Sequence, residues 1–94
     1  MNDFTQYDRT EEDLFLRQSL DALRSIIEDG RELEFEVEGL SCFLSRHEST
    51  CSYSLWIGSS EQAFSSLEEL FRKAQIGETS FRESWPKAKI ITLF

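Results

Sequence analysis

The chain has 94 residues, of which 39% are hydrophobic and 30% charged, and its formal net charge at pH 7 is -8. This length supports a single hydrophobic core and excludes a second one, so we assign residues 1–94 to one domain. The acidic excess disfavours direct binding to nucleic acid or to an anionic membrane and favours a basic protein partner, although solubility alone also accounts for it.

Targeting signals and cysteine content define the expected compartment. No apolar run approaches the roughly 20 residues that span a bilayer, and the amino terminus lacks the basic and apolar segments of a secretion signal. We therefore expect a cytoplasmic protein that does not associate with membranes. The two cysteines, Cys42 and Cys51, are too few for a disulfide framework.

The amino-terminal third is expected to contain one long amphipathic helix. Residues 1–9 show no hydrophobic period, so we expect an arm that either docks through Phe4 and Tyr7 or stays mobile. Thr10 suits an N-cap, and Gly30 suits the left-handed residue that ends a helix. Between them an apolar stripe recurs at steps of three and four, at Leu16, Leu20, Leu23 and Ile27.

The stretch from Arg31 to Val37 alternates apolar and acidic residues, which predicts a half-buried strand. Its apolar side chains would face the core: Leu33, Phe35 and Val37. Its acids would face the other way: Glu32, Glu34 and Glu36. Glu38 and Gly39 are expected to form a two-residue turn that leads into a second strand over Leu40–Arg46.

Two hairpins extend this strand into a three-stranded antiparallel meander. Pairing Val37 with Leu40 sets apolar side chains opposite one another along the first hairpin. A second turn at residues 47–50 leads to a third strand over residues 51–57, and we expect Cys51 opposite Arg46. This register places Phe43 and Trp56 on the same polar face as the glutamates.

The remainder of the chain alternates turns with short elements. Residues 58–62 are expected to form a loop, Gly77 to end a short helix, and Pro86 to stop a helical turn. Residues 88–94 are rich in β-branched and apolar side chains, which predicts a last strand. Two capping boxes are expected to open the helical segments, at Ser65 with Glu68 and at Ser80 with Glu83.

No catalytic or metal-binding motif emerges. Cys42, His47 and Cys51 have a spacing that invites a zinc site, but structural zinc needs four ligands and the predicted hairpin holds the cysteines apart. His47 is the only histidine available as a general base, and no serine or cysteine lies in a recognisable nucleophile motif. We therefore expect no enzyme activity, no metal and no cofactor, and an enzyme using Cys51 or His47 is the minor alternative.

The polar face of the predicted sheet is the candidate interaction site. Clustered aromatic side chains such as Phe43 and Trp56 mark either a partner's footprint or a surface covered by the last strand, the arm or a second copy. The acids form either a docking surface or a solvated strand face. The candidate partner-binding residues are Glu32, Glu34, Glu36, Glu38, Phe43 and Trp56.

Four short segments in the last two-thirds of the chain carry a resemblance: E-L-E-F-E-V-E-G-L (32–40), F-S-S-L-E-E-L-F (64–71), I-G (76–77) and S-F-R-E-S-W (80–85). With the apolar ending, they make the chain resemble small accessory proteins encoded in phages and prophages of Gram-positive bacteria. Those proteins tend to have Asn-Gly where this chain has Glu38-Gly39. The resemblance implies a mobile-element protein in the host cytoplasm, from a class that includes inhibitors of host defence such as anti-CRISPR proteins.

Taken together, the sequence predicts an α+β fold: an N-terminal helix, a three-stranded meander, a short helix with a helical turn, and a C-terminal strand, with the helices on one face of the sheet. The expected function is a non-enzymatic acidic protein that binds and inhibits a basic host defence protein, such as a CRISPR effector. The alternative is a homo-oligomeric structural or regulatory module, such as a homodimer, with a self-complementary sheet face or terminal strand.

Overall fold

A computed structural model describes residues 18–94. The strands of its main sheet are β1 (Leu33–Val37), β2 (Leu40–His47), β3 (Ser52–Ile57), β4 (Ser60–Phe64) and β7 (Lys89–Leu93). The helices are α2 (Leu20–Glu28), α3 (Leu67–Lys73) and α4 (Phe81–Ser84), and α4 passes into the 3₁₀ turn η2 (Trp85–Lys87). A small separate hairpin consists of β5 (Gln75–Ile76) and β6 (Thr79–Ser80).

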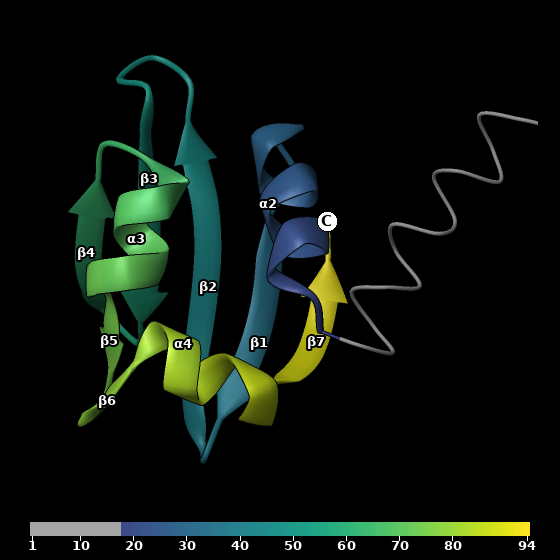
Figure 1. The fold of residues 1–94 in the computed structure, drawn as a ribbon, viewed down its shortest axis with the longest axis vertical. Helices are drawn as coiled ribbons and strands as arrows, with labels where there is room; N and C mark the ends of the chain where they lie inside the picture. Colours follow the sequence, from purple (N-terminus) through teal and green to yellow (C-terminus); the bar gives the residue numbers. More distant parts are fainter. Residues whose placement is uncertain (1–17) are drawn as a thin grey trace, which may run out of the picture.

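These elements form two layers, which confirms the predicted α+β class (Figure 1). The main sheet is antiparallel, with the strand order β4-β3-β2-β1-β7. Helices α2, α3 and α4 all lie over the same face of this sheet, as predicted (Figure 1).

The hydrophobic core lies between the sheet and the helices, and Phe35 of β1 is at its centre. This side chain is fully buried, and its ring meets the rings of Phe81 and Trp85 edge-on at centroid distances of 6.4 and 5.3 Å. Phe81 in turn stacks on Phe71 of α3 at 5.5 Å. Two helices and η2 are therefore fixed to the sheet through one aromatic cluster, which also meets the geometry that aromatic pairs prefer.

The long helix expected after Thr10 is not continuous. Gln18 has a φ of +50° and Ser19 is extended, so neither residue is helical. Helix α2 begins immediately afterwards, with the Ser19 hydroxyl as its cap because that oxygen accepts the N–H of Ala22 at 3.2 Å. Gly30 ends the helix in the left-handed region, as predicted. Thr10 and the arm before it lie outside the described residues.

Contacts with the far end of the chain explain the non-helical conformation of Gln18. The side-chain amide of Gln18 donates to the carbonyl oxygens of Trp85 and Ala88 at 3.0 and 2.8 Å. The indole N–H of Trp85 donates back to the Gln18 carbonyl at 2.6 Å. These three bonds satisfy polar groups beside the core, and a helical Gln18 would not present its carbonyl in the same way.

The first hairpin has the predicted register, with apolar residues opposite one another: Val37 with Leu40, Phe35 with Cys42, and Leu33 with Leu44. Glu38 and Gly39 form its two-residue turn, and both adopt positive φ, at +49° and +85°. The turn is therefore the type I′ form, in which a left-handed residue other than glycine costs about 1 kcal/mol.

The predicted register of the second hairpin is wrong by two residues. Arg46 pairs with Tyr53, and Cys51 belongs to the turn between the strands, where it adopts a φ of +53°. A shift of two leaves each side chain on the face that the alternation predicts, because the side-chain period of a strand is two. Phe43 and Trp56 consequently become direct cross-strand partners.

The prediction of a loop at residues 58–62 is also wrong. The chain turns at Gly58 and Ser59 and continues as β4, antiparallel to β3. A φ of +60° at Gly58 permits this tight turn. Gln62 connects β4 to β5, because its side-chain amide exchanges two hydrogen bonds with the backbone of Gln75, at 2.7 and 3.0 Å.

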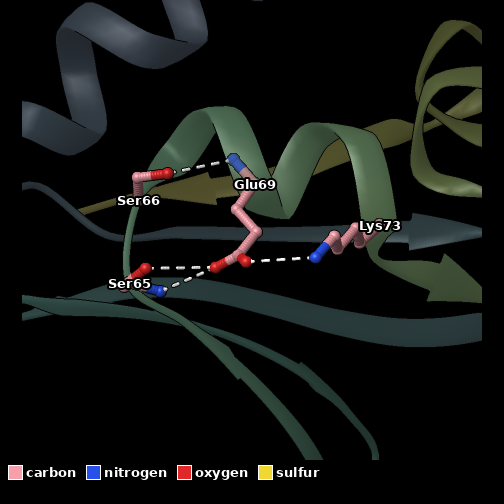
Figure 2. A network of polar contacts seen from close by, with 4 residues as sticks. All are labelled: Ser65, Ser66, Glu69 and Lys73. Atoms are coloured by element: carbon pink, nitrogen blue, oxygen red, sulfur yellow. Dashed lines mark hydrogen bonds and ion pairs between the residues drawn. The ribbon is translucent and has the colours of Figure 1, made fainter.

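The capping box of α3 lies one residue later than predicted (Figure 2). Ser66 is the N-cap, and its hydroxyl accepts the N–H of Glu69 at 3.1 Å. The Glu69 carboxylate accepts the backbone N–H and the hydroxyl of Ser65, at 3.2 and 3.1 Å, and pairs with Lys73 at 3.3 Å. The hydrogen bond from the Ser65 backbone, followed by the contact with Lys73, lowers the pKa of Glu69.

The carboxyl-terminal elements match the sequence analysis except at Gly77. Helix α3 ends at Lys73, and Gly77 lies in the turn between β5 and β6, so the prediction that Gly77 ends the helix is wrong. The Ser80 hydroxyl accepts the N–H of Glu83 at 3.2 Å, so the second capping box opens α4 as predicted. Pro86 lies within η2, after which the chain leaves the helical layer. The predicted last strand is β7, which pairs with β1 at the edge of the sheet.

The cysteines lie in different environments and are both free. Cys42 is on the helix-covered face of β2, where burial raises the pKa of its thiol to about 11. Cys51 is exposed in the turn between β2 and β3. Since the thiolate is the reactive form, the two thiols should differ strongly in reactivity.

Glu69→Gln tests the charge dependence of the α3 cap. Because the pKa of Glu69 is lower in the folded state than its ordinary value of 4.5, its charge stabilises the fold above pH 4.5, and this contribution is lost as the pH falls through the lowered value. The variant should melt at a lower temperature than the wild type at neutral pH, and the two should converge in acid. Glu78→Gln, at an exposed turn position, is the control. A difference for Glu69→Gln that is constant with pH would contradict this account.

Thiol labelling tests the assignment of the two cysteines. In the folded protein one thiol should react quickly with an alkylating reagent, and the second only after denaturation, as followed by intact mass. Cys51→Ser should remove the fast phase and leave the slow one. An internal disulfide in the non-reduced protein, or two equally fast thiols, would contradict the register of the β2–β3 hairpin.

Candidate functional site

The face of the sheet opposite the helices carries most of the predicted partner-binding residues. We call it the open face, because no helix among residues 18–94 lies over it (Figure 1). The strand registers assign the following residues to it: Glu32, Glu34, Glu36, Ser41, Phe43, Ser45, His47, Ser52, Ser54, Trp56, Glu61, Ala63, Lys89, Thr92 and Phe94.

A row of four side chains crosses the middle of the open face. Glu34 pairs with Phe43, Phe43 with Trp56, and Trp56 with Glu61, each as direct partners on adjacent strands. Neighbouring strands are about 4.8 Å apart, so each carboxylate stands next to a ring and the two rings stand next to each other. We call these four residues the central row. Phe43 and Trp56 thus share a face with the glutamates, as predicted, and both are half-buried.

The last strand does not cover these aromatic side chains. Strand β7 lies beside β1 at the sheet edge, so it is not adjacent to β2 or β3, the strands that carry Phe43 and Trp56. Contact with Phe43 comes from Phe94, just after the strand. There the ring of Phe94 meets that of Phe43 edge-on at 5.9 Å, and Phe94 itself remains 57% exposed. The sequence analysis did not include Phe94 in the site, since its position depends on the pairing of β7 with β1.

The acids of the open face keep their negative charge largely uncompensated. Within residues 18–94, no arginine, lysine or histidine side chain forms an ion pair with Glu32, Glu34 or Glu36. Lys89 is the backbone partner of Glu36 and the one lysine on this face. Together with Glu61, the face has four carboxylates against that single lysine, so its local field is negative.

Glu38 is separated from the other predicted residues. It lies in the β1–β2 turn, and its carboxylate is 3.9 Å from the ammonium group of Lys87 in η2. Because η2 belongs to the helical layer, this contact places the Glu38 carboxylate on the side of the helices and not on the open face. The structure therefore brings together five of the six predicted residues.

A polar cluster beside the central row was not foreseen. The hydroxyl of Ser54 donates to the carboxylate of Glu61, and its oxygen is 3.1 Å from Nε2 of His47. Nε2 also lies 3.8 Å from the Glu61 carboxylate. In a catalytic triad the acid bonds the other ring nitrogen and the serine is accessible, whereas here the acid bonds the serine, which is fully buried. The cluster ties three strands together and fixes Glu61.

The part of the chain that the structure describes offers no metal site, no pocket and no membrane-spanning helix. Nowhere in residues 18–94 do three potential metal ligands gather, and these residues enclose no pocket. None of the helices described is long or apolar enough to cross a bilayer. No protein-family model matches the chain, and comparison with curated proteins and with solved structures gave no match.

Proposed function

We propose that this protein binds a basic protein partner through the open face and inhibits that partner without catalysing a reaction. The observation that carries the proposal is the central row, in which two half-buried rings stand between two carboxylates on a sheet face that no helix within residues 18–94 covers. Exposed aromatic clusters on small proteins commonly mark interaction sites, and aromatic side chains supply much of the binding energy there. The surrounding acids match a partner with a positive surface.

The charges and the rings have different roles in this proposal. The uncompensated carboxylates steer a basic partner toward the face, so they act chiefly on the association rate and lose effect in salt. The rings of Phe43 and Trp56 become buried in the complex, so they act chiefly on the dissociation rate.

The proposed class of partner combines charge with the resemblance to phage accessory proteins. We infer a host defence protein in the bacterial cytoplasm, such as a CRISPR effector, whose nucleic-acid-binding surface is basic. Direct imitation of a nucleic acid strand fits β1 poorly, since alternate residues on a strand are about 6.7 Å apart and the charges on one DNA strand about 3.4 Å. The proposed match is therefore to a cluster of basic side chains.

The alternative, a homodimer, is favoured by a different observation. Among residues 18–94, β7 is an edge strand of the sheet, and its own residue Ile91 is 48% exposed. An uncovered edge with apolar side chains can pair with a second copy. Sedimentation tests this alternative, because it requires a dimer that Ile91→Lys dissociates. A monomer at all concentrations would contradict it.

Removing the charges of β1 tests the leading proposal. The triple variant Glu32→Gln, Glu34→Gln and Glu36→Gln preserves side-chain shape while it removes three negative charges. A basic protein captured by the wild type from a Gram-positive host lysate should associate with this variant about tenfold more slowly at low salt, with a flatter salt dependence. The measurement is the binding kinetics of the captured protein across a salt series.

A matched control removes three charges elsewhere. Glu28, Glu48 and Glu78 are exposed and lie outside the open face, so their triple glutamine variant should bind the captured protein much as the wild type does. If the β1 variant folds normally and keeps the affinity and salt dependence of the wild type, the acids only confer solubility and the partner does not dock on them.

A further inference from the structure

Building on the proposed function, we propose that the open face recognises arginine side chains of its partner. Each guanidinium would lie flat on a ring of the central row and pair with the carboxylate beside that ring. The row offers two such seats, one formed by Trp56 with Glu61 and the other by Phe43 with Glu34.

The first seat has a carboxylate that is already oriented. Oε2 of Glu61 accepts the hydroxyl of the buried Ser54, while Oε1 has no hydrogen-bond partner among the described residues. A cation is attracted to an aromatic face when it lies within about 6 Å of the ring centroid. Since Trp56 and Glu61 are adjacent across the strands, one guanidinium can cover the indole and still donate to Oε1.

The second seat has a ring that is held in place. Phe94 meets the ring of Phe43 edge-on at 5.9 Å, so one side of Phe43 is supported by another side chain. Glu34, its cross-strand partner, forms no ion pair within residues 18–94. A ring that is fixed before binding loses less entropy when a cation docks on it, and the Glu34 carboxylate has no ion pair among these residues to give up.

The helical layer of the same protein contains the arrangement that we propose for the open face. The guanidinium of Arg24 lies 5.7 Å from the centroid of the Phe71 ring. The same group pairs with the carboxylate of Glu68 at 2.7 Å. An arginine beside a ring and a carboxylate therefore already occurs in this fold, with the arginine contributed by α2 and both of its partners by α3.

Arginine fits these seats better than lysine. The guanidinium is planar and weakly hydrated, so it stacks on a ring through its face while it donates to a carboxylate through its edge. An ammonium is a compact, strongly hydrated charge that favours a surrounding cage of rings, and the central row is part of a flat sheet face. The rings of the two seats lie on the adjacent strands β2 and β3, which suits arginines about 6 Å apart, such as residues i and i+4 of a helix.

Two synthetic peptides of equal length and charge test this inference, one with six arginines and one with six lysines, each alternating with serine. Binding to the full chain is followed through the NMR signals of the Trp56 and Trp85 indole groups. The arginine peptide should bind at least about fivefold more tightly and shift the Trp56 signal, whereas Trp85, which is buried in the core, should not shift.

Substitution of each aromatic residue tests whether its ring is the source of the preference for arginine. Trp56→Leu and Phe43→Leu each keep an apolar strand residue but remove one aromatic seat, so each should reduce the preference for arginine over lysine. The two variants are independent, and the comparison of peptides on the wild type requires neither of them. An arginine preference that persists in both variants would overturn the assignment to these rings.

The outcomes separate this inference from the proposed function. If the two peptides bind equally, shift the open-face signals and lose affinity in salt, the face accepts basic chains in general, and the arginine inference is overturned while the proposed function stands. If neither peptide shifts any open-face signal, both are overturned.

Discussion

Burial of one side of β1 is the constraint on which the rest of the structure depends. Phe35 is fully buried between the sheet and the aromatic residues of α4 and η2, and Leu33 and Val37 flank it in the core. Because side chains on a strand alternate, burial of these three residues forces the intervening glutamates to the opposite face. The acidic open face is therefore a direct consequence of how the core is built, and a one-residue shift of β1 would bury its acids.

The open face is rigid for the same reason. Its side chains are on strands of a sheet whose other side is fixed by the core, and the cluster of His47, Ser54 and Glu61 joins three of those strands. Ser54 is fully buried although no described helix covers this face, and the side chains of His47 and Glu61 contact its hydroxyl from the strands on either side. A binding surface on such a scaffold needs little reordering when a partner docks, which favours affinity.

Local sequence patterns were sufficient to predict an element where apolar and polar residues alternate strongly or where the helix cap is unambiguous. The first hairpin, the cap at Ser80 and the last strand follow from such patterns, and they are enough to place Phe43 and the glutamates on one face. Features that depend on contacts between distant parts of the chain could not be predicted from the sequence. The non-helical conformation of Gln18 depends on hydrogen bonds to residues near the other end of the chain. Strand β4 is polar, and its sequence, S-E-Q-A-F, has no clear alternation.

Two smaller errors of prediction, in the cap of α3 and in the register of β2 with β3, arose where the sequence allows two equivalent assignments. Two serines are followed by two glutamates around Ser66, so two capping boxes one residue apart are equally plausible from the sequence. The turn before β3 likewise allowed two registers that differ by two residues and give the same faces. Glu61 and Phe94 were missed for the same kind of reason, since each joins the open face only through a strand pairing that the sequence does not specify.

The accessibility of the open face in the free protein is the central claim, and hydroxyl-radical footprinting at low protein concentration tests it most directly. We predict rapid oxidation of Phe43, Trp56 and Phe94 and slow oxidation of Phe35 and Trp85, measured residue by residue by mass spectrometry. Protection of Phe43 and Trp56 equal to that of Trp85 would contradict the account, because it would mean that this face is already covered and that no partner docks on it.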